Sequence, residues 1–341
     1  MDPNFRFPPL IEGDYIETVE GMLFAVKGLF HPEGRVVAYL RYLPDPKGER
    51  RRGDRTYRRV YDLEETTETL RRRYPQYLSH VESRGLTLQT VPWSRVARIY
   101  RPRERLRSLM ANPRNELERI VATFADALST ESGVPLERFG VSGSVLIGLD
   151  TPSSDVDLIV YGAEAGKRAY EALRRLRERS GWISPYDERA VKRVVKVRWG
   201  DTSIGLERFR AIEMRKVLHG VVCGRDYFVR LVKKPDEVEA ERSSEPLGRV
   251  RLRATISGHA DSIFTPCTYQ VEDCVFLDAD HQHEVSELVS FRGKFTEQAR
   301  EGDVVEGGGT LERVRYDDRT IYRVVMGGRG DYLIPIKALD R

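Results

Sequence analysis

The sequence predicts an α+β protein, in which a mixed sheet with helices is flanked by an N-terminal β-rich domain and a C-terminal antiparallel β barrel or sandwich. Short apolar segments separated by Gly and Pro dominate both ends of the chain, and this spacing is typical of strands. Helical periodicity is concentrated instead between residues 112 and 234. With 341 residues, the chain is long enough for two or three domains with separate cores.

Composition limits the class of protein. The chain is 40% hydrophobic and 32% charged, which is typical of a folded, soluble protein. No apolar segment approaches the length that a membrane-spanning helix needs. The three cysteines, Cys223, Cys267 and Cys274, have no C-x-x-C spacing, so neither a disulfide framework nor a zinc knuckle is indicated. We therefore expect a cytoplasmic protein.

Residues 1–105 are predicted to form the N-terminal β-rich domain. Gly21, Pro32 and Gly34 separate its first apolar segments, and a polar, arginine-rich loop begins at Pro44. No combination of catalytic side chains is evident in this part of the sequence. The strands are expected at 15–19, 22–29, 35–43 and 55–61, and a short helix at 63–74.

Residues 112–234 are predicted to form the central domain. Asn112 before Pro113 is a good helix start, because Asn caps helices and Pro suits the first turn. Apolar residues then recur at helical spacing until Gly133, which is a typical helix end. The segments that follow are a strand at 139–142, a short helix after the Gly143-Ser144 turn, a strand at 155–161, helices at 164–179, 188–199 and 203–218, and a strand at 227–232.

Residues 247–341 are predicted to form the C-terminal β domain, after a charged linker at 234–246. Several short strands separated by turn residues are typical of a small barrel or sandwich. Two glycine runs, Gly307-Gly308-Gly309 and Gly327-Gly328, are expected to be turns. The strands are expected at 249–257, 269–277, 285–290, 310–316, 320–326 and 331–336.

The segment from Gly143 to Leu158 is the strongest indication of function. Asp155 and Asp157 are two residues apart at the start of an apolar strand, so their side chains project from the same face. Neighbouring carboxylates repel each other unless a cation neutralises them, and a hard divalent ion is the natural partner. Gly143 lets the backbone approach a ligand closely, and Ser144 offers an N–H and a hydroxyl. A phosphate-binding turn beside metal-binding carboxylates is suited to phosphoryl or nucleotidyl transfer.

This pattern, G-S-x3-G-x5-S-D-x-D-L, resembles the signature of the DNA polymerase beta-type nucleotidyltransferase superfamily. The resemblance covers about residues 112–234. It implies that Asp155 and Asp157 hold Mg²⁺, or alternatively Mn²⁺, against the triphosphate of an NTP. It also implies that Gly143, Ser144 and Ser154 belong to the nucleotide-binding site.

Two features of the motif leave roles to be assigned. In the superfamily a third carboxylate lies on a neighbouring strand, and Asp226 at the start of the 227–232 segment is the candidate, with Glu207 and Asp201 in reserve. Minimal nucleotidyltransferases often carry a basic residue directly after Gly-Ser, where this chain has Val145-Leu146-Ile147. Any basic contact to the triphosphate must therefore come from elsewhere.

Alternatives remain open for function and acceptor. The leading hypothesis is a Mg²⁺-dependent enzyme that transfers NMP to a hydroxyl of RNA, a protein or a small molecule. The other is a nucleotide- or RNA-binding regulatory protein with the same fold and no activity. Arginine clusters such as Arg50-Arg51-Arg52 slightly favour nucleic acid, although most such clusters are solvated faces. The segment Asp278–Glu284 is rich in potential metal ligands, but it is interpreted as a polar loop between strands.

Overall fold

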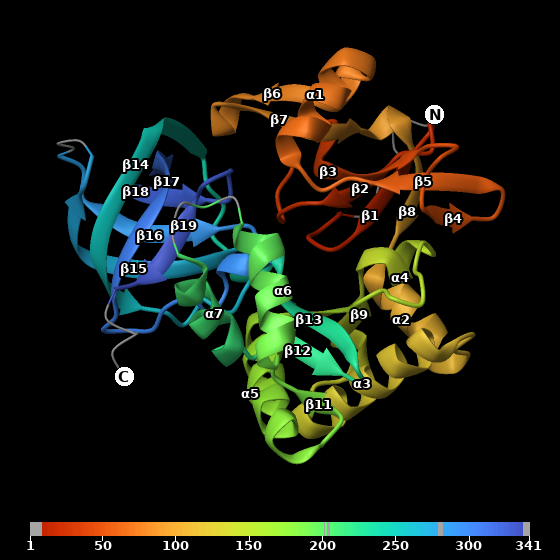
Figure 1. Cartoon of the computed structure of the whole chain (residues 1–341). Helices are drawn as coiled ribbons and strands as arrows, with labels where there is room; N and C mark the ends of the chain where they lie inside the picture. Colours follow the sequence, from red (N-terminus) through yellow and green to blue (C-terminus); the bar gives the residue numbers. More distant parts are fainter. Residues whose placement is uncertain (1–8, 201, 203–204, 279–281, 337–341) are drawn as a thin grey trace.

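The computed structural model describes residues 9–200, 202, 205–278 and 282–336. It contains an N-terminal sheet, a central sheet with helices and a C-terminal barrel (Figure 1). The predicted α+β class, with β-rich parts on both sides of a mixed core, is confirmed.

The N-terminal sheet has two buried faces. On one face, Leu70 of helix α1 (Leu63–Arg73) packs in a core with Phe24 and Leu40. On the other, Tyr42 and neighbouring aromatic residues pack against Leu146 of the central domain. The strand order is β4-β5-β3-β2-β1-β8, with β7 paired to β3 and β6. The strands are β1 Tyr15–Thr18, β2 Leu23–Val26, β3 Arg35–Pro44, β4 Arg50–Arg52, β5 Arg55–Arg59, β6 Leu78–Val81, β7 Leu86–Pro92 and β8 Val96–Tyr100.

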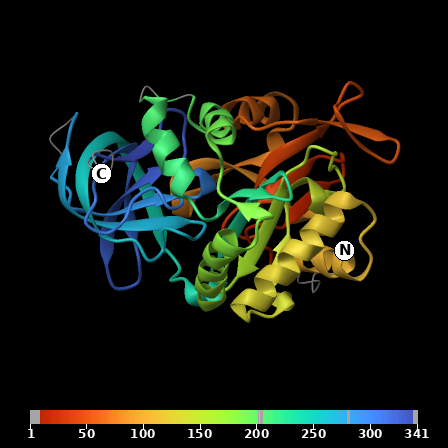
Figure 2. The same ribbon diagram turned by 60° about the horizontal axis from the view of Figure 1, so that its bottom comes forward.

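The central sheet is mixed, with the order β11-β12-β13-β10-β9. Strands β10 and β13 are parallel, whereas β9 and β12 run antiparallel to their neighbours. Helices α3 and α5 lie side by side over one face (Figure 2), and the other face is turned toward the N-terminal domain. The elements are α2 Pro102–Ala111, α3 Glu116–Ser132, β9 Phe139–Val141, α4 Gly143–Ile147, β10 Val156–Tyr161, α5 Ala163–Arg179, β11 Ile183–Ser184, α6 Glu188–Trp199, α7 Leu206–Arg215, β12 His219–Val222 and β13 Arg225–Val232.

The predicted helix start at Asn112 is wrong. Asn112 is the C-terminal cap of α2, and Asn115 caps α3 instead by accepting a hydrogen bond from the N–H of Glu118 at 2.9 Å. Helix α2 therefore ends where the sequence predicted a helix start, and the 17-residue helix α3 begins directly after Asn115, whose side chain supplies the capping oxygen. Gly133 does end α3, in a left-handed conformation.

The C-terminal domain is a closed barrel in which β14 pairs with both β15 and β17. The strand order β14-β15-β16-β18-β17-β14, with β16 and β18 parallel, is that of an OB-fold barrel. Its interior forms one core with the buried faces of α6 and α7. In this core the ring of Trp199 stacks on that of Phe209, with 4.1 Å between the ring centroids. The strands are β14 Ser243–Gly258, β15 Cys267–Phe276, β16 Val285–Ser290, β17 Val304–Arg315, β18 Thr320–Met326 and β19 Tyr332–Pro335.

The expected turn at Gly307-Gly308-Gly309 is also wrong, since all three residues lie inside β17. Close packing explains two of the three glycines: a Cβ at Gly309 would lie 2.5 Å from the carbonyl oxygen of Val325, and one at Gly308 would lie 2.9 Å from the Tyr332 ring. Glycine is needed at these positions because the neighbouring backbone and ring leave no room for a side chain.

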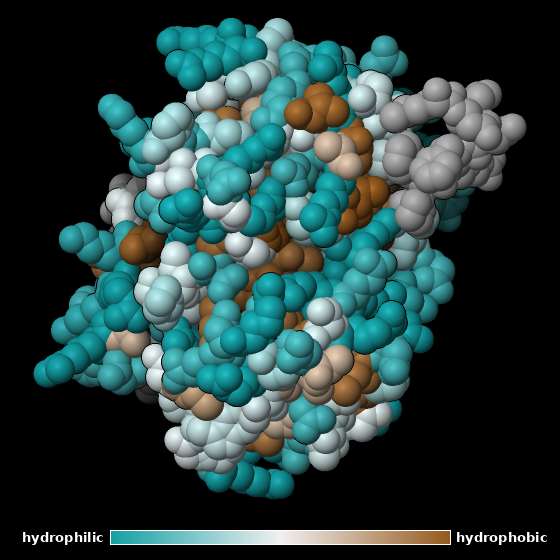
Figure 3. All heavy atoms as spheres, turned by 90° about the vertical axis from the view of Figure 1, so that its right-hand side faces the viewer, coloured by the Kyte–Doolittle hydropathy of each residue, from teal (hydrophilic) through white to brown (hydrophobic). Residues whose placement is uncertain are grey.

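The surface is mostly hydrophilic on the face shown in Figure 3, and hydrophobic side chains are visible mainly at the height where the N-terminal and central domains meet. Among the described residues, no helix is long and apolar enough to cross a membrane.

Glu118 joins α2 to α3 and gives a pH-dependent contribution to stability. Its carboxylate is buried and forms ion pairs with Arg105 and Arg114, each at 2.6 Å. Burial alone would raise the pKa of Glu118, but hydrogen bonds from Arg114 and Arg105 lower it to about 2.

We expect Glu118→Gln to lower the free energy of unfolding at pH 7 by about 2 kcal/mol. Because the folded-state pKa lies below the ordinary value of 4.5, this contribution is complete above pH 4.5 and is lost as the pH falls toward 2. Urea unfolding at pH 7, 5, 4 and 3 measures the difference in the free energy of unfolding between the wild type and Glu118→Gln. Glu116→Gln, at an exposed position, is the control. If the difference for Glu118→Gln does not change with pH, the assignment is wrong.

Candidate active site

The Gly143 turn lies directly against the carboxylate of Asp157. Strands β9 and β10 are antiparallel neighbours, and α4 leaves β9 at Gly143. Gly143 has a φ of +61°, and a Cβ there would lie 2.1 Å from Asp157 Oδ2. Only glycine therefore satisfies both the backbone conformation and the close approach. The turn and the acid form one continuous surface.

Asp155 and Asp157 line a cavity of about 240 Å³ between the central sheet and the N-terminal domain. Burial and the charge of Asp155 raise the pKa of Asp157 to about 7, against the opposing effects of Arg230 and Arg59. Two neighbouring carboxylates that resist ionisation together fit a divalent cation, which would neutralise both.

Ser144 and Ser154 hold the two ends of the motif together. The Ser144 hydroxyl donates to the Ser154 hydroxyl at 3.2 Å, and both residues are buried. Ser144 also lines the cavity with Gly143, whereas Ser154 is not among its lining residues. The Ser154 hydroxyl instead accepts hydrogen bonds from the Thr151 N–H at 2.9 Å and from Arg50 at 3.1 Å. Ser154 thus supports the motif from outside the cavity, through its hydrogen bonds to Ser144, Thr151 and Arg50.

Asp226 lies on the strand next to the Asp155–Asp157 pair. In the parallel pairing of β10 and β13, Phe228 lies opposite Asp157, so Asp226 is level with Asp155 on the same face. The structure does not bring its carboxylate into the pair: Asp226 forms an ion pair with Arg193 at 3.2 Å. In the described part of the chain, no group of three His, Cys, Asp or Glu side chains is arranged to hold a metal ion.

The N-terminal domain supplies cavity residues that sequence reasoning missed. Lys27, Arg41 and Arg59 line the cavity from β2, β3 and β5 or their ends. Arg50 and Arg52 attach the same domain to the motif, by hydrogen bonds to the carbonyl oxygens of Leu149 and Ile147. The one available signal was the excess of arginine, and a strand pattern alone does not reveal which arginines face another domain.

The central and C-terminal domains each add a cation to the cavity. Arg230 of β13 and Arg292, which follows β16, are among its lining residues. Residues of all three sheets, or of the segments next to their strands, therefore line the cavity.

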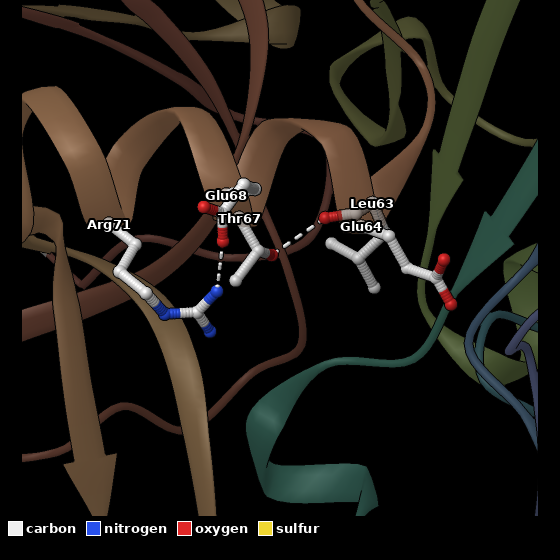
Figure 4. A pocket seen from close by; sticks show the side chains of 5 residues that line it. All are labelled: Leu63, Glu64, Thr67, Glu68 and Arg71. Atoms are coloured by element: carbon white, nitrogen blue, oxygen red, sulfur yellow. Dashed lines mark hydrogen bonds and ion pairs between the residues drawn. The ribbon is translucent and has the colours of Figure 1, made fainter.

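A second hollow and the Asp278–Glu284 run lie away from this site. The hollow is on the exposed side of α1 and is lined by Leu63, Glu64, Thr67, Glu68 and Arg71 (Figure 4). Two of its charged side chains are paired with each other, since Arg71 donates to Glu68 at 2.5 Å. In the run, Asp278 accepts from the Arg251 N–H and His283 stacks on Tyr322, while residues 279–281 lie outside the described residues.

Comparisons with known proteins agree with this geometry. Residues 121–214 match the model of the nucleotidyltransferase domain family. The chain is 29% identical over 328 residues to "Uncharacterized protein MJ1086" of Methanocaldococcus jannaschii, covering 92% of this chain and 94% of that protein. No solved structure matches.

The fold of the central sheet and the motif are those of a nucleotidyltransferase domain. In particular, the chain carries a nucleotidyltransferase domain of the DNA polymerase beta-like superfamily, as the motif predicted.

Gly143→Ala tests the contact between the turn and Asp157. Gly148, at φ +68°, is the matched control, because a Cβ there would approach nothing closer than 3.7 Å. Both variants should lose about 1–2 kcal/mol of stability from the left-handed backbone. Only Gly143→Ala displaces Asp157, so it alone should weaken Mn²⁺ binding, by at least about tenfold. Mn²⁺ titration followed by electron paramagnetic resonance measures the affinity. Equal losses of Mn²⁺ affinity in both variants would contradict the prediction.

Proposed function

We propose that this protein is a Mg²⁺-dependent nucleotidyltransferase that transfers NMP from an NTP to an acceptor hydroxyl and releases pyrophosphate. The observation that carries the proposal is the contact of the Asp157 carboxylate with the Gly143 turn in a cavity that is also lined by basic side chains. The match of residues 121–214 to the nucleotidyltransferase domain supports it.

The proposed roles follow from the positions of the side chains. Asp155 and Asp157 would hold Mg²⁺ or Mn²⁺, because both face the cavity and each bears oxygen ligands. Gly143 and Ser144 bind phosphate oxygens through the backbone N–H and the hydroxyl, and Ser154 fixes the Ser144 hydroxyl. When bound, the ion would neutralise phosphate charge and favour deprotonation of the acceptor hydroxyl.

Asp226 is proposed as the third carboxylate. It lies on the strand adjacent to β10 and on the face that carries Asp157. Its present partner, Arg193, is 64% exposed, and ion pairs this exposed contribute at most about 1 kcal/mol. Exchange of Arg193 for a cation shared with Asp155 is therefore energetically inexpensive.

A second candidate function is nucleotide binding without transfer. The Asp226–Arg193 ion pair favours it, since this arrangement leaves only two acids in the cavity. The two functions differ in one readout. Both predict Mg²⁺-dependent stabilisation by an NTP, but only the enzyme releases pyrophosphate.

The acceptor could be RNA, a protein side chain or a small molecule. Barrels of the C-terminal type bind oligonucleotides in other proteins. Here the exposed side chains of β15 include Glu272 and Asp273, whose charge repels phosphates. Fold analogy alone therefore gives no support for RNA binding by this barrel.

We expect Asp155→Ala and Asp157→Ala each to reduce NMP transfer by about 100-fold or more, because each removes a ligand of the ion that stabilises the transferring phosphoryl group. Incubation with each labelled NTP and with total cellular RNA or protein measures both transfer and pyrophosphate release. Asp126→Ala, on the exposed side of α3, is the control. Activity that survives both cavity changes would refute these roles.

Asp226→Ala and Arg193→Gln break the same ion pair from opposite ends. If Asp226 is the third carboxylate, its removal should lower kcat by about 100-fold, whereas Arg193→Gln should leave kcat within about threefold of the wild type. Steady-state kinetics at saturating NTP separates the two variants. Equal effects would show that the ion pair has a structural role.

A further inference from the structure

The cavity at the domain junction carries more positive than negative charge. Its described lining residues include five basic side chains but only the two acids Asp155 and Asp157. A divalent cation on the two acids would cancel their charge, so these acids would no longer offset the charge of Arg41 and Arg59 in the cavity. Taking a cation out of water without a counter-charge is costly, so this part of the cavity is suited to an anion.

Two of the basic side chains are already neutralised. Glu12 is buried and forms ion pairs with Lys27, at 2.7 Å, and with Arg230. Burial alone would raise the pKa of Glu12, but Lys27 and Arg230 lower it, so this carboxyl is ionised. Lys27 and Arg230 therefore form a closed network with Glu12.

Arg41 and Arg59 are not neutralised in this way. Neither guanidinium forms an ion pair with any residue that the structure describes. Both side chains line the cavity and are half-buried. Arg59 also stacks on the ring of Tyr61, at 4.2 Å from the guanidinium carbon to the ring centroid, which fixes its plane.

The strands that carry these arginines are anchored to the nucleotidyltransferase motif. Strand β5, which ends at Arg59, pairs with β3 and β4, and Tyr42 lies opposite Arg59. From β4, Arg50 binds the Leu149 carbonyl oxygen and the Ser154 hydroxyl, at 3.1 Å each. The positions of Arg41 and Arg59 relative to Asp157 are thus set by strand pairing and by hydrogen bonds to the motif, as a preorganised binding site requires.

We propose that Arg41 and Arg59 of the N-terminal domain bind the triphosphate of the nucleotide. This inference rests on the proposed nucleotidyltransferase function and extends it, because the basic contact that is missing after Gly143-Ser144 is supplied by a different domain. Arginine suits the role, since its planar guanidinium makes two parallel hydrogen bonds to phosphate oxygens. The N-terminal domain is then part of the nucleotide site.

Inorganic tripolyphosphate is the probe, because it contains the phosphate chain and nothing else of the nucleotide. We expect Arg41→Gln and Arg59→Gln each to weaken its binding by about 10- to 100-fold, as measured by isothermal titration calorimetry with Mg²⁺. Arg58→Gln is the matched control: Arg58 is the neighbour on β5 but pairs with Glu65 and Asp45. Its affinity should equal that of the wild type.

Lysine variants guard against a general loss of structure. Arg41→Lys and Arg59→Lys keep the charge but lose the paired hydrogen bonds, so their affinities should fall between those of the wild type and the Gln variants. Unchanged binding in the Arg41 and Arg59 Gln variants, or an equal loss in Arg58→Gln, would overturn the proposal.

The binding measurement separates this proposal from the proposed function. If Arg41→Gln and Arg59→Gln lose tripolyphosphate but the wild type transfers no NMP, the phosphate site stands and the enzymatic function fails. If Asp155→Ala abolishes transfer while the Gln variants bind tripolyphosphate normally, the enzymatic function stands and the phosphate role of these arginines fails.

Discussion

The candidate site depends on two carboxylates that are held side by side in a partly enclosed cavity. Asp157 in β10 and Asp155 just before it both line the cavity, and the Gly143 turn lies directly against Asp157. Burial and mutual repulsion keep the pKa of Asp157 near 7. Such an arrangement is unfavourable in isolation, and proteins keep unfavourable arrangements where function needs them. The proposed cation site, the proposed phosphate-binding turn and the proposed role of the arginines all depend on this arrangement.

The N-terminal sheet and the C-terminal barrel both contribute residues that line this site. The N-terminal sheet places a tyrosine-rich face against α4 and is fixed there by Arg50, Arg52 and the hydrogen bond from Ser142 to the Gly13 carbonyl. The C-terminal barrel contributes Arg292 to the same cavity. The barrel interior shares one core with α6 and α7, and these helices lie between β11 and β12 in the chain, so they attach the barrel to the central sheet.

Sequence patterns predicted the strongly periodic elements well. Helix α6 and strands β16 and β18 have their predicted bounds, since each combines a clear apolar pattern with turn residues at its ends. Strand β4 was missed because Arg50-Arg51-Arg52 is polar throughout; its pairing with β5 and its contacts with the motif, not apolar burial, define it. The glycines of β17 were misassigned because a packing requirement and a turn use the same residue.

The sequence by itself determined that the chain carries a nucleotidyltransferase domain, because Gly143, Ser144, Asp155 and Asp157 form one motif within a short segment of the chain. The tertiary structure decided everything that depends on distant segments. It placed Arg41 and Arg59 over that surface, and it paired Asp226 with Arg193 and not with the other two acids. The physical reason is that domain docking depends on faces contributed by many strands, and no single segment of the sequence records which faces will meet.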